Sequence, residues 1–445
     1  MAFTRRETVI LILGDFLILC ASLWVALVLR NFALPSQSYF DTLLVPFVPL
    51  LLLSLVVFYI AGLYEKQTMP VRRVMGERVA GAQVANAITA ALLFFVLHLS
   101  VAPKTILALY LFVSIAGVSA WRLYRMSRET RTESRVPALL VGCGSAVEEV
   151  YSEVNKNGRL FIRFVERLDT SQLSESEELL ARVRAALAAG VRTVVLDARD
   201  PVVTRDLPKL YESMIGDVSF VDFAEFYEGV FDRVPLAHVD YVWLLAHLPD
   251  RLSPYDIAKR TLDLFGAALG LAMASPFILV AALVLKPTGP AFIFNERVGK
   301  GGRTFQMIKL RTMLFNDQGD PELRAKNRVT AVGRFLRKSR IDELPQLWNV
   351  LVGDASFIGP RPELPALVAV YEREIPYYQA RHSIPPGLSG WAQLREPDAP
   401  KGGPDVEKTR TKLSYDLYYL KHRSFGLDLA IALKTLRALA AFSGK

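Results

Sequence analysis

The sequence predicts a membrane protein of mixed α and α/β class, built from three successive parts. Three observations lead to this class. Hydrophobic residues fill 52% of the 445 positions and charged residues only 22%, which is more apolar than an ordinary soluble protein. Four long apolar runs occupy the first quarter of the chain, and an alternation of strand and helix patterns follows them. We place the three parts at residues 1–135, 136–250 and 251–445.

The first part is predicted to be a bundle of four transmembrane helices. Its apolar runs cover 8–29, 43–64, 79–101 and 106–121, each near the roughly 20 residues that cross a bilayer. A cleavable signal peptide is excluded because three further runs follow the first. Asp15 and His98, in or near these runs, are assigned to interior packing or an interfacial position in preference to a proton relay.

Flanking cations orient this bundle. They precede the first run, lie between the second and third, and follow the fourth, where Arg122 is the first of five arginines. Because cytoplasmic loops carry the excess of Lys and Arg, both ends of the bundle are expected in the cytoplasm. The two cysteines, Cys20 and Cys143, cannot build a disulfide framework, so the aqueous part requires no oxidising compartment.

The middle part is predicted to be a Rossmann-like α/β domain. Strand patterns at 136–141, 160–165, 193–196 and 218–223 alternate with helical patterns at 147–154 and 177–189. The turn Gly142-Cys-Gly144 lacks the third glycine of a dinucleotide fingerprint, because that position holds Val147. Glu166 or Asp169 would supply the ribose acid. We therefore favour a structural, dimerising or regulatory role over a dinucleotide site.

The third part begins with another apolar segment, 262–285, which is predicted to enter the membrane and return. Ser275-Pro276 lies at its midpoint, where proline removes a helical hydrogen bond. Both flanks are cationic, as expected for a re-entrant helix whose two ends lie on one side. The alternative is a proline-kinked helix that spans the bilayer, which would place the C-terminal part outside the cytosol.

A strongly basic segment follows this membrane segment. Residues 286–345 hold thirteen Lys plus Arg and six Asp plus Glu, a net of +7 out of +9 for the whole chain. Such a surface binds anionic lipid head groups or a phosphorylated substrate. Nucleic acid is disfavoured because no RNA- or DNA-binding motif is present.

An acidic pair stands in this basic surrounding. The spacing of Leu344, Leu347, Trp348 and Leu351 predicts an amphipathic helix, with Asp342 and Glu343 at its start. Free backbone N–H groups there are expected to keep carboxylates ionised. Simple N-capping is one interpretation of the pair. The other is chemical, with one carboxylate attacking phosphorus and its neighbour holding Mg²⁺.

The C-terminal part resembles a known family through seven sequence blocks that occur in order. The blocks are Gly289-Pro-Ala-Phe292, Arg297-Val-Gly299, Gly302-Arg-Thr-Phe305, Lys309-Leu-Arg-Thr-Met313, Asp342-Glu-Leu-Pro-Gln-Leu-Trp-Asn349, Ser356-Phe-Ile-Gly-Pro-Arg-Pro362, Pro386-Gly-Leu-Ser-Gly-Trp-Ala-Gln393, with Tyr415-Asp-Leu-Tyr-Tyr419 beyond them. With these blocks the chain resembles the bacterial sugar transferases, the monotopic polyprenyl-phosphate phosphoglycosyl transferases, and the N-terminal helices resemble those of the large members.

The resemblance implies an enzyme that transfers hexose 1-phosphate from a UDP-hexose to undecaprenyl phosphate and releases UMP. Asp342 would be the nucleophile that carries the phosphosugar, and Glu343 would bind Mg²⁺. Substrate contacts are expected from Lys309, Arg311, Arg340, Arg361 and Gln393. The resemblance further implies a homodimer in the bacterial inner membrane, with the catalytic domain on the cytoplasmic face, that initiates exopolysaccharide, capsule or O-antigen synthesis.

Two alternatives remain open at this point. A membrane-anchored NDP-sugar dehydratase or epimerase would use a Tyr-x-x-x-Lys pair, and Tyr255 and Lys259 have that spacing. A non-enzymatic assembly protein of the polysaccharide machinery would have lost its carboxylates, which are present here. The sequence does not determine which hexose is transferred or in which pathway.

Overall fold

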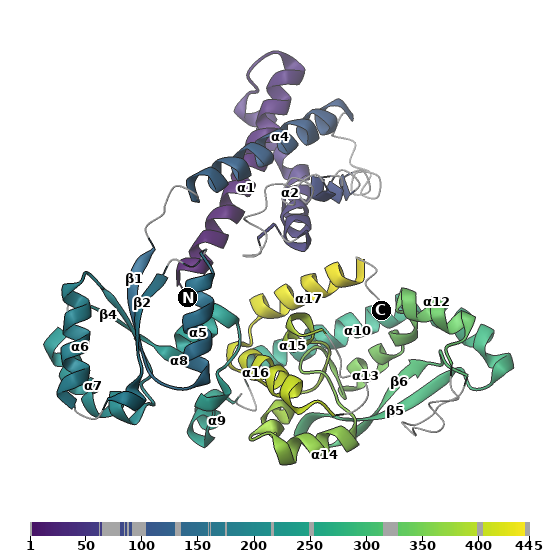
Figure 1. The fold of residues 1–445 in the computed structure, drawn as a ribbon. Coiled ribbons are helices and arrows are strands. Elements are labelled where there is room, and N and C mark those ends of the chain that lie inside the picture. Colours follow the sequence, from purple (N-terminus) through teal and green to yellow (C-terminus); the bar gives the residue numbers. More distant parts are fainter. Residues whose placement is uncertain are drawn as a thin grey trace. The chain divides into compact units, whose positions relative to one another are not determined.

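The structure is a computed structural model of the whole chain, coloured along the sequence in Figure 1. It describes residues 2–61, 63–64, 81–83, 85–86, 89–90, 104–129, 135–158, 160, 162–173, 176–214, 218–248, 253–314, 328–397 and 404–440. The chain divides into two compact units, Met1–Arg135 and Val136–Lys445, which are described separately.

The first unit consists of long apolar helices. They are α1 (Ala2–Asn31), α2 (Gln37–Ile60) and α4 (Lys104–Glu129). Segments of α1 and α4, Val9–Asn31 and Thr105–Arg122, are long and apolar enough to cross a membrane, and α2 holds a shorter apolar stretch, Phe47–Ile60. Most of the predicted third helix, and His98, fall outside the described residues. The membrane character of this unit is therefore clear, although a four-helix bundle is not demonstrated.

A buried ion pair joins α1 to α4. Asp15 is fully buried and pairs with Arg122, while the Tyr64 hydroxyl donates to the same carboxylate over 2.8 Å. Arg122 also donates to the Leu63 carbonyl at 2.9 Å. Asp15 thus has the predicted packing role. Arg122, which the orientation argument counts among the flanking cations, lies inside the helix packing.

The second unit begins with a four-stranded parallel sheet of order β2-β1-β3-β4. Its strands are β1 (Val136–Val141), β2 (Ile162–Leu168), β3 (Thr193–Leu196) and β4 (Ser219–Asp222). Helices cover both faces of the sheet: α5 (Ser145–Lys156) and α8 (Phe223–Phe231) one face, α6 (Ser176–Ala188) and α7 (Pro201–Met214) the other (Figure 1). Each strand lies close to its predicted position.

Successive residues of β1 supply two separate cores. Ala138 and Leu140 pack with α5 and α8, whereas Leu139 and Val141 pack with α6 and α7. Side chains alternate across a strand, so a central strand that is apolar at every position buries both faces. The continuous apolar run 136–141 predicts this arrangement correctly.

The chain after α8 contributes to the hydrophobic core of the C-terminal part, although His238 also contacts Asp197 at the edge of the sheet. This segment contains η2 (Leu236–His238) and α9 (Tyr241–His247). Val234, Val239 and Trp243 belong to the same hydrophobic core as Tyr371 and Leu417. The packed core therefore crosses the boundary that the sequence places at residue 250.

Helix α10 (Pro254–Leu285) is continuous through Pro276, so the predicted helix–break–helix is not observed as an interruption. Proline has no N–H to donate to the Ala272 carbonyl four residues earlier. The Ser275 hydroxyl donates to that carbonyl instead, over 2.9 Å. Because a side chain replaces the missing backbone donor, the helix continues past the proline.

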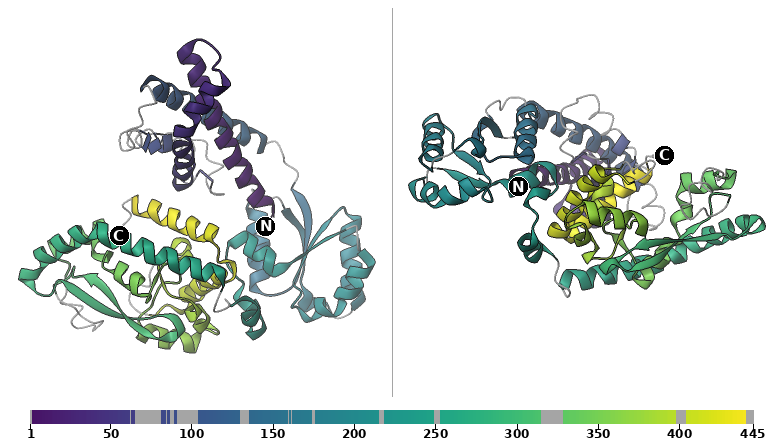
Figure 2. Two further views of the ribbon diagram at one scale, coloured as in Figure 1. Left: turned by 180° about the vertical axis from the view of Figure 1, so that it is seen from behind. Right: turned by 60° about the horizontal axis from the view of Figure 1, so that its bottom comes forward.

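The remaining elements form the C-terminal part, which the two views of Figure 2 show from other sides. β5 (Phe292–Val298) and β6 (Thr304–Leu310) pair antiparallel, and β7 (Ser356–Ile358) pairs in parallel with β8 (Gly387–Ser389). The helices are η3 (Lys286–Thr288), η4 (Lys300–Gly302), α12 (Ala331–Ser339), η5 (Ile341–Glu343), α13 (Gln346–Val352), α14 (Pro365–Glu374), η6 (Tyr378–Ser383), α15 (Trp391–Arg395), α16 (Val406–His422) and α17 (Phe425–Ala440).

One side of α10 docks on α13 and β7. A Cβ atom added at Gly270 would stand 3.2 Å from the Leu347 side chain, so glycine allows the two helices to approach closely. Arg260 donates to the carbonyls of Val350 and Leu351, at the end of α13. Asp263, buried, accepts from the Ser356 hydroxyl at 2.7 Å. Polar contacts thus fix the apolar helix against the element that follows the acidic pair.

Candidate active site

The acidic pair lies in a single 3₁₀ turn, η5, between α12 and α13. Arg340 ends α12 with φ of 57° and ψ of 15°, a left-handed conformation that glycine usually occupies at a helix end. A residue with a side chain pays about 1–2 kcal/mol there. The arginine at this strained position directs its side chain to the acidic pair, as the next contacts show.

Glu343 is held by two cations. Lys309 Nζ, on β6, donates to Glu343 Oε1 at 2.8 Å, and Arg340 Nη1 donates to Oε2 at 3.3 Å. Burial raises the pKa of the Glu343 carboxyl, but the charges of Lys309, Arg340 and Arg361 outweigh it and lower the pKa below its usual value. Glu343 is therefore an ionised, paired carboxylate, and three of the predicted contact residues act on it.

Asp342 has the opposite environment. Its side chain is only 8% exposed, and among the described residues its Oδ1 atom has no hydrogen-bond partner. Burial, followed by the charge of Glu343, raises the pKa of Asp342, while Lys309, Arg337 and Arg340 oppose the rise. Neither η5 nor α13 shows a side-chain cap hydrogen bond, so the capping interpretation is not supported. The pKa of Asp342 is not lowered as the position at a helix start predicts, because burial and the charge of Glu343 raise it.

The predicted apolar face of the following helix is only partly buried. The fully buried positions of α13 are Gln346, Asn349 and Val350, whereas Trp348 is 51% exposed. Leu347 lies against Gly270 of α10, and Leu351 packs against the core formed by Ala267, Val350 and Ala355. Two polar side chains of α13 are thus more deeply buried than the apolar positions that its spacing identifies.

Arg361 lies in the loop after β7, and its guanidinium is exposed. A residue absent from the predicted site positions this loop: Arg381, on η6, donates to the Arg361 carbonyl at 3.0 Å. Arg381 is buried, pairs with the buried Asp416 at 2.8 Å and donates to the Tyr378 hydroxyl at 2.6 Å. No local pattern announces this arginine, because its partners come from α16 and the loop after β7.

Two predicted contact residues have other surroundings. Arg311 is buried and donates to the carbonyls of Leu285, Thr288 and Leu314, which fastens the end of α10 to the end of β6. These contacts give Arg311 a structural role, and its phosphate contact stays a prediction. Gln393 lies on α15 and makes no side-chain hydrogen bond within the described residues, so its role stays a prediction.

The acidic side chains of this site could supply only part of the ligand shell of a magnesium ion. No group of three or more His, Cys, Asp or Glu side chains in the described ranges forms a complete metal site. Mg²⁺ in phosphate chemistry commonly keeps waters and uses one or two carboxylates plus substrate phosphates. The Glu343 carboxylate would supply one such ligand, and the phosphates of a bound nucleotide would supply others. Such an ion would arrive with a nucleotide.

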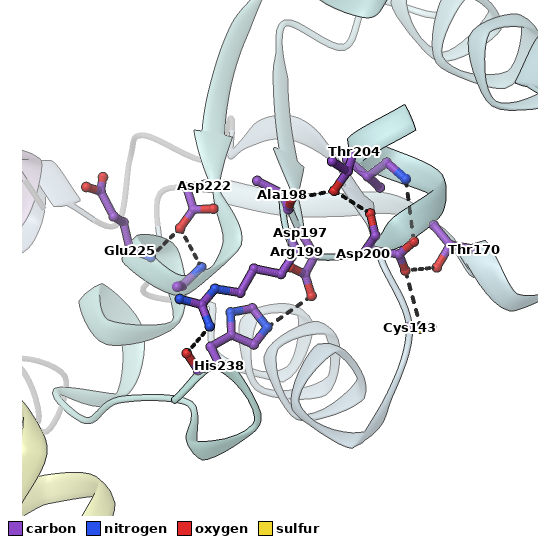
Figure 3. A network of polar contacts seen from close by, with 12 residues as sticks. Cys143, Thr170, Asp197, Ala198, Arg199, Asp200, Thr204, Asp222, Glu225 and His238 are labelled. Carbon is purple, nitrogen blue, oxygen red and sulfur yellow. Dashed lines mark hydrogen bonds and ion pairs between the residues drawn. The ribbon is translucent and has the colours of Figure 1, made fainter. Parts of the chain in front are cut away.

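The carboxyl edge of the parallel sheet contains a second polar network, drawn in Figure 3. Asp200 accepts from Cys143 and Thr170 and caps the start of α7 through Val202 N. Asp197 accepts from His238 Nε2 at 3.0 Å (Figure 3). Two buried carboxylates at the glycine turn would repel a pyrophosphate, so the network favours the structural interpretation of this domain.

The two residues with dehydratase-like spacing also have structural partners. The Tyr255 hydroxyl donates to Asp428 at 2.7 Å, and Lys259 Nζ lies 3.1 Å from the same carboxylate. Both contacts fix the start of α10 to α17. Neither the tyrosine nor the lysine is directed toward the sheet edge at which a dinucleotide would bind.

Comparisons with known proteins agree with the geometry. The family model described as "Bacterial sugar transferase" matches residues 254–441. The chain is 37% identical over 252 residues to the "UDP-N-acetylgalactosamine-undecaprenyl-phosphate N-acetylgalactosaminephosphotransferase" of Aeromonas hydrophila, covering 55% of this chain and 58% of that protein. It is 44% identical over 190 residues to the "UDP-glucose:undecaprenyl-phosphate glucose-1-phosphate transferase" of Caulobacter vibrioides, covering 41% and 70%.

A shorter relative is matched almost entirely. The "Exopolysaccharide production protein PSS" of Rhizobium leguminosarum bv. phaseoli is 35% identical over 189 residues, which are 40% of this chain and 94% of that protein. The match with the Aeromonas relative covers less than two thirds of the length of that protein.

Proposed function

The chain belongs to the bacterial sugar transferase family, and on this basis we propose that it transfers a hexose 1-phosphate from a UDP-hexose to undecaprenyl phosphate, releasing UMP. The named relatives differ in their sugar, glucose in one and N-acetylgalactosamine in another. The proposal therefore specifies the reaction and the two substrate classes, and leaves the hexose to experiment.

The proposed reaction has two displacements at phosphorus, and the first involves Asp342. A carboxylate oxygen attacks the β-phosphorus of the UDP-hexose, and the new O–P bond forms as the bond to the bridging oxygen breaks. UMP leaves with that electron pair. A nucleophile that forms a covalent intermediate divides one difficult transfer into two easier steps. Asp342 suits this role because its carboxylate has no ion-pair partner within the described residues.

In the second displacement, a phosphate oxygen of undecaprenyl phosphate attacks the phosphorus of the aspartyl phosphosugar. The O–P bond to Asp342 breaks, the carboxylate is regenerated, and the lipid diphosphate sugar is released. Lys309, Arg340 and Arg361 supply positive charge for the phosphoryl oxygens as they become more negative. Mg²⁺, held by Glu343 and by the phosphates of the nucleotide, would neutralise charge on the leaving UMP.

One observation is the main support for this proposal: the two adjacent carboxylates have different surroundings. Glu343 is paired with Lys309 and Arg340, while Asp342 is buried beside it without a partner in the described part of the chain. Two capping or purely structural carboxylates would both find hydrogen-bond donors, as buried polar groups nearly always do. A nucleophile, in contrast, must keep one oxygen free for phosphorus.

The direct test replaces the nucleophile. In Asp342→Asn, UMP release from UDP-sugars should fall by roughly 1,000-fold or more, and no covalent phosphosugar should form, because the amide cannot displace UMP. UMP would be measured over a panel of UDP-sugars with and without undecaprenyl phosphate. Wild-type protein should release a stoichiometric burst of UMP in the absence of the lipid. Undiminished turnover of the variant would remove Asp342 as the nucleophile.

We extend the proposal to the setting of the reaction. The parallel sheet with helices on both faces supports a Rossmann-like middle domain, and the apolar helices of the first unit support a four-helix transmembrane bundle. Flanking cations support a bacterial inner-membrane location with the catalytic part on the cytoplasmic face, where UDP-sugars are found. The homodimer and the start of a polysaccharide pathway remain predictions from the family resemblance.

A further inference from the structure

Gln346 is a buried amide without a hydrogen-bond partner next to the acidic pair. Its side chain is 5% exposed, and among the described residues its Nε2 atom finds no acceptor. Leu344 and Pro345 have helical backbone angles, so the chain runs from η5 into α13 as one helical path. Residues four apart on such a path lie on the same side. Gln346 therefore shares the side of the helix on which Asp342 is buried.

The next polar residue of α13, Asn349, is an example of a buried amide with a structural role on the same helix. Asn349, also buried, donates to the Gln306 carbonyl at 2.8 Å and accepts from Ile308 N at 3.1 Å. Both halves of its amide thus bind the backbone of β6. Since Gln346 lies one turn nearer the acidic pair and lacks such contacts within the described residues, the packing of α13 does not explain it.

An unpaired buried amide is costly, because its desolvation is not compensated by a hydrogen bond. Two such atoms, Asp342 Oδ1 and Gln346 Nε2, occur on the same side of one helical path. We infer that Gln346 donates a hydrogen bond to the hexose phosphate group while Asp342 attacks it and carries it. This inference rests on the proposed function and adds a substrate-binding residue to it.

The inference predicts that activity and stability change in opposite directions. Gln346→Met keeps the size of the side chain and removes the amide. Because no partner is lost, thermal stability in detergent should stay equal or rise. Both half-reactions, the UMP burst and the transfer to undecaprenyl phosphate, should slow by roughly 10- to 100-fold, since the phosphosugar takes part in both. Gln346→Glu, which brings a negative charge to the phosphate, should slow both further.

Asn349→Leu is the matched control on the same helix. This substitution should lower thermal stability, because the Asn349 amide is bonded to β6.

The pH profile of kcat/KM distinguishes a contact between Gln346 and the substrate from an effect of Gln346 on the pKa of Asp342. The informative part is its acid limb, the fall in kcat/KM toward low pH. An unchanged limb in Gln346→Met agrees with substrate contact, whereas a limb shifted to higher pH would mean that Gln346 acts through Asp342 and would overturn the inference.

Two further outcomes separate this inference from the proposed function. If wild-type protein releases UMP and both Gln346 variants match its rates, the Gln346 contact is refuted and the transferase function stands. The same holds if Gln346→Met loses stability as Asn349→Leu does, since the amide would then have a structural partner. If wild-type protein releases no UMP from any UDP-sugar, both the function and the contact are refuted.

Discussion

At the scale of single residues, the active site depends on giving two neighbouring carboxylates different protonation behaviour. Burial and the adjacent negative charge raise the pKa of Asp342, whereas Lys309 and Arg340 hold the pKa of Glu343 low despite burial. Pairs of titratable groups whose environments separate their pKa values are typical of active sites. When ionised, Asp342 is more basic than an ordinary aspartate and correspondingly more nucleophilic.

The raised pKa predicts the pH dependence of the first half-reaction. Asp342 must be ionised to attack, so kcat/KM should fall as pH decreases through a pKa above the ordinary 3.8. Lys309 lowers that pKa, so Lys309→Met should move the acid limb to higher pH, in addition to reducing the rate. Lys338→Met is the control, because Lys338 is not among the charges acting on Asp342. If kcat/KM falls over the same acidic pH range in wild type and in Lys309→Met, this account of the site is contradicted.

At the scale of elements, Arg381 joins η6, α16 and the loop that carries Arg361. Its guanidinium lies against Asp416 and Tyr378 and donates to the Arg361 backbone. The group is buried, and the Asp416 carboxylate is the strongest of the groups that stabilise its charge. His382 beside it is also buried, and burial together with the Arg381 charge lowers the pKa of His382 to about 4, which leaves this histidine neutral at physiological pH.

Removing Arg381 should therefore damage stability and substrate binding together. Arg381→Met leaves Asp416 as an uncompensated buried charge, for which about 3 kcal/mol of unfolding free energy is expected to be lost. The KM for the UDP-sugar should rise, because Arg361 loses its support. The control is Arg373→Met, whose pair with Glu374 is exposed and should contribute less than about 0.5 kcal/mol. Thermal unfolding and steady-state kinetics would measure both. Equal unfolding of the two variants would refute the bracing role.

At the scale of the whole molecule, the membrane contact extends beyond the N-terminal helices. Helix α10 exposes large apolar side chains along the side that does not face α13, among them Phe265, Leu269, Met273 and Phe277. An apolar surface of this extent on an aqueous protein marks a membrane or partner contact. Since α10 also docks on α13, the carboxylates proposed for catalysis lie within a few residues of a helix apolar enough to enter a membrane. This arrangement suits a reaction between a water-soluble nucleotide and a lipid phosphate.

The cationic flanks of α10 predict that both of its ends lie on the cytoplasmic side. Single cysteines at Ile257 and Lys286, in a chain with Cys20 and Cys143 replaced by serine, should both resist a membrane-impermeant thiol reagent until the cells are permeabilised. Phe32→Cys, in the loop between α1 and α2, should be labelled from outside, because few cations flank that loop. Labelling of the Ile257 and Lys286 positions from opposite sides would establish a spanning helix and contradict the re-entrant prediction.

Some features of the fold follow from the sequence because neighbouring residues encode them. The apolar run 136–141 identifies the central strand, and its length and composition are sufficient. The long apolar runs likewise identify α1, α4 and α10 as membrane helices. Proline at position 276 suggests a break by the same local reasoning, but α10 continues through it, and the Ser275 hydroxyl donates to the carbonyl that the proline cannot reach.

Periodicity, composition and motif are properties of adjacent residues, so they were enough to predict the class of the protein, its apolar segments and the acidic pair with its basic surroundings. Which cation meets which anion depends on the folded chain. Lys309 reaches Glu343 across 34 positions, and Arg122 reaches Asp15 across 107. The burial that raises the pKa of Asp342 likewise depends on the fold. Desolvation and ion pairing arise from residues that are distant in the chain, and no local pattern records them.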